Sequence, residues 1–295
     1  MPPASAAALL AGVVDYAGLF PPAALSMRAA AAEYQAALAS PDAWMLGRFV
    51  VTAARLTELA DALAALPGPR TDWRISAIVR DNAADDWTSI AAFNRDRTRH
   101  HAHVDTAESK PQTLEGIDWL AAHRTEGLDV YVEIAPGPDV ATWLARVADR
   151  GLRAKMRTGG LTAEAFPAAD ALAACLAAVV ASGVPFKVTA GLHHAVRGTY
   201  RLTYDTDAAQ APMYGYLNVL LAATTLRAGR PVAVAEALLR RTDAASLVFA
   251  ASDVRWGDDV FSVSLLRETR ARHLVSVGSC SFCEPAEELG ALLSR

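Results

Sequence analysis

Short apolar runs alternate with amphipathic helical segments along almost the whole of this 295-residue chain. The apolar runs expected to form strands are eight in number and lie at residues 11–17, 44–52, 73–80, 101–107, 128–135, 152–158, 184–190 and 274–282. Helices are expected at residues 26–40, 54–65, 86–96, 114–123, 140–150 and 168–181, and from residue 285 onwards. A helix between consecutive strands implies a parallel sheet. The pattern therefore predicts an α/β fold, a (β/α)8 or TIM barrel that forms a single domain over residues 1–295.

The connection between the seventh and eighth expected strands is longer than one helix requires. We interpret residues 195–272 as a helical insertion before the last strand. Helices are expected in it at residues 214–226 and 232–239, and a further β-like run at 246–251. A second arrangement is also open, in which this β-like run belongs to the barrel and residues 11–17 only precede it.

Composition argues against several classes of partner. The net charge is −4 and the chain has no block of basic residues, so a nucleic-acid surface is not expected. The cysteines Cys175, Cys280 and Cys283 are few and odd in number, and the N-terminus reaches Asp15 without a basic leader, which indicates a cytoplasmic protein. Residues 168–184 are apolar but alanine-rich and interrupted by an aspartate, so we expect a buried helix and no membrane span. No glycine-rich nucleotide motif follows a strand, which predicts no cofactor, and homo-oligomer formation is left open.

Two of the expected strands carry one lysine each, Lys155 in A-K-M-R-T-G-G and Lys187 in F-K-V-T-A-G-L. An ammonium group is costly to bury in an apolar strand, and two of them on consecutive strands are hard to explain by packing. Like charge and desolvation both disfavour ammonium, so we expect the pKa of at least one of the two lysines to be lowered. A neutral amine is a nucleophile for carbonyl groups, which points to Schiff-base chemistry.

Side chains at the carboxyl ends of barrel strands face the active site. Besides the lysines, the expected strand ends carry carboxylates, an arginine, two histidines and a cysteine-containing loop: Asp15, Asp105, Glu133, Arg157, His193, His194 and residues 278–283. One amine can condense with a ketone or aldehyde, and a carboxylate can move the protons that this condensation requires.

Several of these stretches are similar to motifs of the deoxyribose-phosphate aldolase family of class I aldolases. The family's K-T-S-T-G strand resembles K-M-R-T-G at residues 155–159, and its K-A-S-G-G-I-R strand resembles K-V-T-A-G-L-H at residues 187–193. A family V-D pair is matched by Val104-Asp105, and its first strand, I-D-x-T-x-L-x-P, resembles the segment around Asp15. The family's G-A-S-S resembles G-S-C-S at the end of the last expected strand. The resemblance covers roughly residues 9–194 and 274–295.

The resemblance implies a cofactor-independent lyase that acts on a small carbonyl compound. Lys155 would be the Schiff-base nucleophile, Lys187 the ammonium that lowers the pKa of that nucleophile, and Asp105 the proton-relay carboxylate. The opposite assignment, with Lys187 as the nucleophile, is also open. The residues expected to contact the substrate are Asp15, Glu133, Arg157, Thr158, Gly159, Thr189, Gly191, His193, His194, Gly278 and Ser279.

The chain departs from this family where a phosphate would be held. Ala190 replaces the first of two family glycines. Glu284, Glu287 and Glu288 place acidic groups at the start of the last helix, where a phosphate would otherwise be favoured. The sequence therefore argues against a simple sugar phosphate as substrate and favours a divergent branch.

Two other functions are open from sequence. The first is a metal-dependent hydrolase or isomerase that uses His193, His194 and Cys280 or Cys283. Adjacent side chains on an extended segment point in opposite directions, so no metal site is predicted. The second is a catalytically silent barrel that binds a small anion through the two lysines and Arg157.

Overall fold

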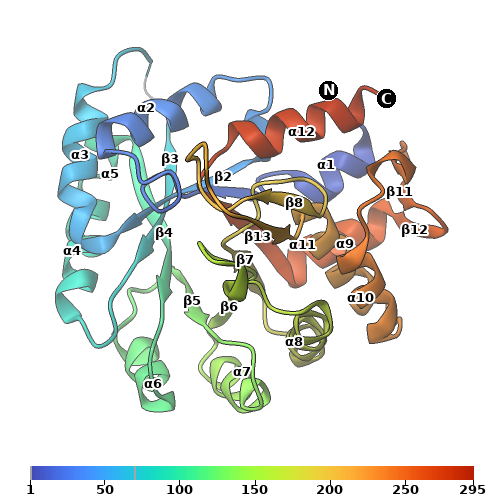
Figure 1. Cartoon of the computed structure of the whole chain (residues 1–295). Coiled ribbons are helices and arrows are strands. Elements are labelled where there is room, and N and C mark those ends of the chain that lie inside the picture. Colours follow the sequence, from blue (N-terminus) through green and yellow to red (C-terminus); the bar gives the residue numbers. More distant parts are fainter. Residues whose placement is uncertain (1, 70) are drawn as a thin grey trace.

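The computed structural model describes residues 2–69 and 71–295 and contains a closed barrel of eight parallel strands (Figure 1). Neighbouring strands follow the order β1-β13-β7-β6-β5-β4-β3-β2. The barrel strands are β1 (Val14–Tyr16), β2 (Leu46–Thr52), β3 (Trp73–Ile78), β4 (Ala102–Ser109), β5 (Asp129–Glu133), β6 (Arg153–Arg157), β7 (Phe186–Thr189) and β13 (Leu274–Ser279). The predicted (β/α)8 barrel is confirmed.

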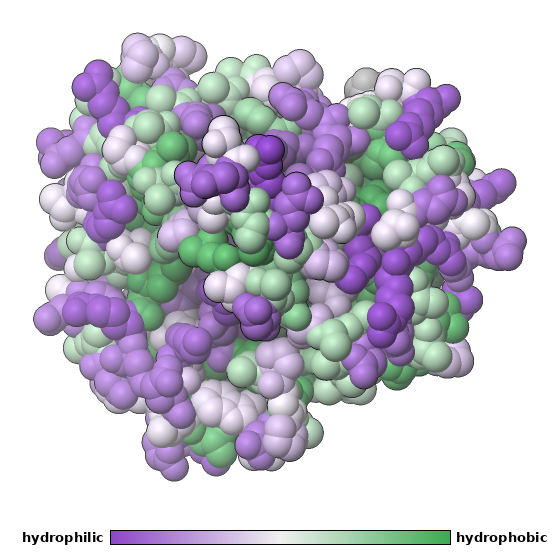
Figure 2. Space-filling model, viewed as in Figure 1, coloured by the Kyte–Doolittle hydropathy of each residue, from purple (hydrophilic) through white to green (hydrophobic). Residues whose placement is uncertain are grey.

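Helices surround the barrel and bury their apolar faces against the strands (Figure 1). They are α1 (Ala4–Leu10), α2 (Met27–Leu38), α3 (Leu56–Ala65), α4 (Ala84–Arg95), α5 (Arg97–His100), α6 (Leu114–His123), α7 (Val140–Asp149), α8 (Ala169–Ser182) and α12 (Cys283–Leu293). Ser26 caps α2 as expected, because its hydroxyl accepts a hydrogen bond from the backbone N–H of Ala29. Hydrophilic side chains cover much of the face seen in Figure 2, with apolar side chains between them.

One segment, Ala163–Ser182, is long and apolar enough to cross a membrane by length and composition alone. In the structure it includes α8, which packs beside α7, α9 and α10 on the outside of the barrel. Leu172, Leu176 and Val179 of α8 are fully buried. The segment therefore forms one of the barrel's covering helices, although part of its surface is exposed.

The connection from β7 to β13 contains more than the expected helices. Its helices are α9 (Tyr216–Arg227), α10 (Val232–Arg240) and α11 (Val263–Arg272), and its strands are β8 (Gly198–Arg201), β9 (Gln210–Met213), β10 (Leu247–Phe249), β11 (Asp253–Trp256) and β12 (Asp259–Ser262). The insertion therefore contains the expected helices together with two small antiparallel sheets. The β-like run at 246–251 contributes β10 to a three-stranded antiparallel sheet outside the barrel, and residues 11–17 supply the first barrel strand. The alternative strand assignment is excluded.

The fourth barrel strand is longer than its sequence suggested. It was expected to end at Ala107, but β4 continues to Ser109 and pairs with β5 over its last four residues. A register shift between Ile75 and Ser76 of β3 leaves Asp105 as an extra residue on β4, between Val104 and Thr106. This bulge determines which carboxylate of β4 lies beside the lysines.

Candidate active site

Lys155 and Lys187 are register partners on the adjacent strands β6 and β7. Both side chains are buried, and Lys187 is the deeper, with 1% of its surface exposed against 8% for Lys155. The Lys187 amine also lies 5.5 Å from the centre of the Tyr131 ring. Two amines in register on one face of neighbouring strands must lie close together.

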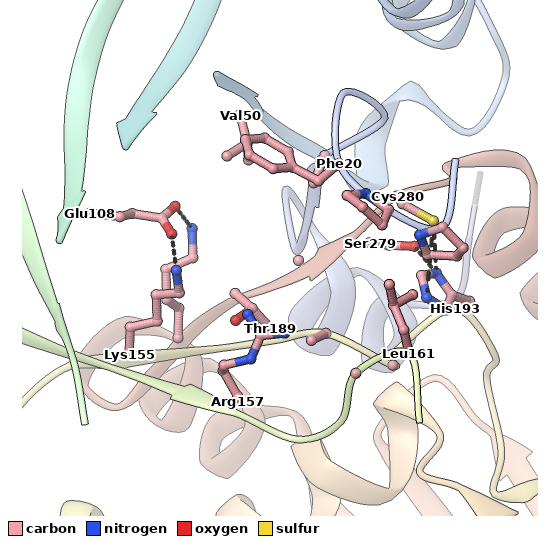
Figure 3. Close-up of a pocket in the computed structure, with 18 of the residues that line it drawn as sticks. Phe20, Val50, Glu108, Lys155, Arg157, Leu161, Thr189, His193, Ser279 and Cys280 are labelled. Carbon is pink, nitrogen blue, oxygen red and sulfur yellow. Dashed lines mark hydrogen bonds and ion pairs between the residues drawn. The ribbon is translucent and has the colours of Figure 1, made fainter. Parts of the chain in front are cut away.

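Glu108, near the carboxyl end of β4, joins the two amines. Its Oε1 is 2.6 Å from Lys187 Nζ, and its Oε2 is 3.0 Å from Lys155 Nζ (Figure 3). The Ser76 hydroxyl on β3 donates to the same Oε1 at 2.6 Å. The two lysine nitrogens are thus separated by no more than these two contacts and the width of one carboxylate. Glu108 itself is 2% exposed.

Each lysine has a second carboxylate partner. Lys187 donates to Asp15 Oδ2 at 2.6 Å, and Lys155 lies 3.1 Å from Glu133 Oε2. Asp15 is fully buried and also accepts hydrogen bonds from the Ser276 hydroxyl and from a backbone N–H of β2. Gly47 makes room for it, since a Cβ there would lie 2.5 Å from Asp15 Oδ1. The result is a connected network in which every buried charge has a partner.

The charges of this network set the protonation of its members. Burial alone would lower the pKa of Lys187, but the carboxylates of Asp15 and Glu108 outweigh it and raise that pKa. Burial alone would raise the pKa of Glu108, but the two ammonium groups hold it well below its usual range. The pKa of Glu133 is also lowered, since Lys155 outweighs its desolvation. Lys187 is therefore held as ammonium.

Asp105 does not end its strand, which corrects its predicted position. It accepts hydrogen bonds from Arg48 at 2.6 Å and from Arg74 at 2.8 Å, and it lies three residues before Glu108 along β4. Burial would raise its pKa, but the two guanidinium groups outweigh that effect and lower it. The ion pairs of Asp105 within the described residues are with these arginines and not with either lysine.

A cavity of about 250 Å³ opens above the two amines. In Figure 3, Lys155 and Glu108 lie at one end and His193, Ser279 and Cys280 at the other. Its walls are largely apolar and include Ala17, Phe20, Pro21, Pro22, Val50, Ile78 and Leu161. Of the residues predicted to contact substrate, those that line it are Arg157, Thr189, Gly191, His193, Gly278 and Ser279.

The other predicted contact residues lie behind or outside this wall. Asp15 and Glu133 support the lysines from the sides. The Thr158 hydroxyl donates to the carbonyl of Ala190 at 2.8 Å and so ties the loops after β6 and β7 together. Gly159 packs against Phe166, and His194 is 2.6 Å from Glu288. These five residues act on the site through their neighbours.

The two histidines do not converge on one point. His193 Nδ1 lies 3.1 Å from Ser279 Oγ and 3.5 Å from Cys280 Sγ, whereas His194 turns to Glu288 and stacks on Tyr200. Burial lowers the pKa of His193 to about 4, so its imidazole is neutral near pH 7. Within residues 2–69 and 71–295, no three His, Cys, Asp or Glu side chains form a group able to hold a metal ion.

Sequence reasoning missed Glu108 and the hydroxyls of Ser76 and Ser276. One available signal was lysine usage. The chain contains 28 lysines and arginines together, and only three of these are lysines. The third, Lys110, lies 3.3 Å from Glu133 and therefore borders the same cluster. Every lysine of the chain thus lies at the mouth of the barrel.

The site combines a fixed ammonium, a second and more exposed amine, a carboxylate between them and a cavity in front of them. Such an arrangement can bind a carbonyl compound, form a bond to it and move protons around it. Comparison with known protein families and with curated proteins gave no match to this chain.

Proposed function

We propose that this protein is a class I, Schiff-base-forming aldolase-like lyase that acts on a small carbonyl compound. The observation that carries the proposal is the pair of buried amines held by one carboxylate on the floor of an open cavity. A site that only bound an anion would not need Glu108 between its two cations, because this carboxylate neutralises the positive charge that would attract the anion.

The choice of lysine over arginine supports amine chemistry. A guanidinium keeps its proton at every accessible pH, whereas an amine can lose its proton and attack a carbonyl. The chain uses arginine for nearly all of its basic positions and keeps lysine for this one place. Ion pairing alone would not require that distinction.

Both lysines line the cavity, and we assign Lys155 as the nucleophile because it is the more exposed of the two. Lys187 is the fixed ammonium, held by Asp15 and Glu108. Glu108 takes the proton-relay role in place of Asp105, because it contacts both amines. Contact distance and burial support each assignment.

In the proposed reaction Lys155 first passes a proton to a neighbouring carboxylate, and the resulting neutral amine attacks the carbonyl carbon and gives a carbinolamine. Its hydroxyl leaves as water after protonation, and the iminium cation then accepts the electron pair of the carbon–carbon bond that breaks. The aldehyde product departs, and an enamine remains on Lys155. Protonation of this enamine and addition of water release the second product and restore the amine. Glu108 and Glu133, each about 3 Å from Lys155, are placed to exchange these protons.

Borohydride reduction in the presence of small aldehydes and ketones tests the proposal. Intact mass should increase by one reduced adduct, and Lys155→Met should abolish the increase. Lys110→Met is the matched control, because Lys110 borders the same cluster but does not line the cavity, and this variant should still be trapped. Circular dichroism of each variant verifies that it is folded.

The same experiment separates the proposal from its rivals. No adduct with any carbonyl, together with stoichiometric metal in the purified protein, would indicate a metal-dependent enzyme. No adduct and no metal, with thermal stabilisation by small anions, would indicate an anion-binding barrel. Either outcome contradicts the Schiff-base proposal.

A further inference from the structure

A second pair of polar side chains lies one step above the amines. Arg157 and Thr189 are register partners on β6 and β7, two residues beyond the lysine pair on the same strands. Both line the cavity, and Figure 3 shows them next to each other between Lys155 and Leu161. Residues two apart on a strand share a face and are about 6.6 Å apart. The cavity therefore presents a pair of amines and, one step higher, a guanidinium with a hydroxyl.

Neither side chain of the upper pair has a hydrogen-bond or ion-pair partner among residues 2–69 and 71–295. The Arg157 guanidinium makes no ion pair or side-chain hydrogen bond within the described part of the chain, and it lies 3.9 Å from the position of a Cβ on Gly160. The Thr189 hydroxyl oxygen is buried and has no hydrogen-bond partner among the described residues. Its methyl group faces Gly278, where a Cβ would lie only 3.0 Å away. Arg157 is exposed and can be hydrated, so the buried Thr189 hydroxyl is the group that lacks a partner, and the guanidinium beside it is free to bind a ligand that this hydroxyl also contacts.

The charge balance indicates the sign of that ligand. Three carboxylates, from Asp15, Glu108 and Glu133, face the three lysines of the cluster, and each carboxylate contacts at least one of them. Arg157 adds a further positive charge, and none of these carboxylates contacts it. A planar anion suits a guanidinium best, because two parallel N–H groups can donate to its two oxygens.

We propose that the donor substrate is a short 2-oxo acid, with its carbonyl carbon at Lys155 and its carboxylate at Arg157 and Thr189. This rests on the proposed function and specifies its substrate class. In a 2-oxo acid the carboxylate is bonded directly to the carbonyl carbon. One molecule can therefore contact Lys155 with its carbonyl group and the Arg157–Thr189 pair, two residues further along β6 and β7, with its carboxylate. The apolar wall formed by Phe20, Val50 and Ile78 accommodates its carbon chain.

Part of the region that would hold a phosphate in such a barrel is already filled by side chains. Barrels of this kind bind phosphate with the loops after the seventh and eighth strands and a nearby helix N-terminus. Here the Phe166 ring covers Gly159 and Gly191, since a Cβ on either glycine would lie less than 3 Å from it. The Glu288 carboxylate accepts the backbone N–H of Ala195 at 2.6 Å. Side chains of the protein therefore cover the glycines after β6 and β7 and occupy one backbone N–H of the loop after β7, which favours a carboxylate over a phosphate.

The chemistry of this donor balances without another reagent. The Lys155 amine adds to C2 and water leaves, which gives an iminium cation. Loss of a proton from C3 to a neighbouring carboxylate gives an enamine, and C3 then bonds to the carbonyl carbon of an acceptor aldehyde. Water releases the 4-hydroxy-2-oxo acid and the free amine. In the reverse direction the same steps cleave that product.

The test measures the concentration dependence of borohydride trapping for a matched set of probes. Pyruvate carries the carboxylate, methyl pyruvate has the same ketone without the charge, and glyceraldehyde 3-phosphate carries a phosphate. We expect half-saturation for pyruvate at a concentration about ten- to a hundredfold lower than for methyl pyruvate. Arg157→Gln should remove this preference, Arg157→Lys should keep part of it, and Thr189→Val should reduce it about threefold to tenfold.

Each outcome decides between the two levels of the proposal. Equal half-saturation for pyruvate and its ester, a preference that survives in Arg157→Gln, or stronger trapping of the phosphorylated aldehyde overturns the 2-oxo acid but leaves the Schiff-base function standing. Failure to trap any carbonyl on the wild-type protein overturns the function and the substrate class together. Retained trapping of methyl pyruvate by Arg157→Gln shows that this variant is folded and has a reactive amine.

Discussion

Removing the charge of Glu108 is the sharpest structural perturbation available. Its carboxylate is almost fully buried and contacts Lys155 at 3.0 Å, Lys187 at 2.6 Å and Ser76 at 2.6 Å. In Glu108→Gln the shape is kept, but two buried ammonium groups lose a shared counter-charge. Removal of one partner from a buried ion pair costs about 3–5 kcal/mol. Each lysine keeps one other carboxylate, so we expect a loss near the lower end, about 3 kcal/mol.

A double-mutant cycle with Lys187→Met isolates the charge interaction. Each single variant leaves a buried charge with one partner fewer, whereas the double variant removes both charges. The double variant should therefore lose at least about 2 kcal/mol less than the sum of the two single losses. Urea denaturation of all four proteins at pH 7 gives the four unfolding free energies. Additivity within about 0.5 kcal/mol would refute the coupled network.

Glu133→Gln provides the matched control. Glu133 also contacts Lys155, but its second partner is the largely exposed Lys110. Water screens the Lys110 pair, and Glu133 contacts one buried lysine where Glu108 contacts two, so we expect a smaller loss, about 1–2 kcal/mol. A loss as large as that of Glu108→Gln would show that burial does not set the strength of these pairs.

Three further predictions concern single side chains. Ala190 has a φ of +70°, a left-handed backbone conformation that strains alanine but not glycine. Ala190→Gly should therefore raise the unfolding free energy by about 0.5–1 kcal/mol, and a lower value in urea denaturation would contradict this backbone strain. Folding lowers the pKa of His193 from 6.5 to about 4, so below pH 6.5 the unfolded chain binds a proton that the folded chain does not, and the unfolding free energy falls. Between pH 7 and pH 5 the wild type should therefore lose about 2 kcal/mol more unfolding free energy than His193→Gln. An equal pH dependence of the two unfolding free energies would contradict the lowered pKa. In NMR spectra of ¹³C-lysine-labelled protein, which should show three lysine signals, the Lys187 signal should titrate above its usual range, and titration below it would disprove the fixed ammonium.

The barrel and the lysine pair could be predicted because both depend on periodic patterns. Each lysine lies in an apolar run long enough to identify as a strand, and parallel neighbours bring equivalent positions together. Lys155 and Lys187 are indeed register partners. The short strands of the insertion were less accessible, since a run of three or four residues such as β8 carries little alternation.

Glu108 could not be predicted because its position depends on where β4 ends and on a bulge within it. The segment T-A-E-S has weak strand propensity, so the strand was expected to end at Ala107. The bulge at Asp105 then shifts the alternation of the strand, a feature that the pairing with β3 determines. Motif similarity drew attention to Asp105, which binds Arg48 and Arg74 instead.

Mapping the reduced adduct to one lysine tests the central claim most directly. Wild-type protein is reduced with borohydride in the presence of small aldehydes and ketones, digested with chymotrypsin and analysed by peptide mass spectrometry. The chain offers only three lysines and one α-amino group as sites, so the result is unambiguous. We predict the adduct on Lys155. An adduct on Lys187, on Lys110 or on the α-amino group, or none at all, would contradict it.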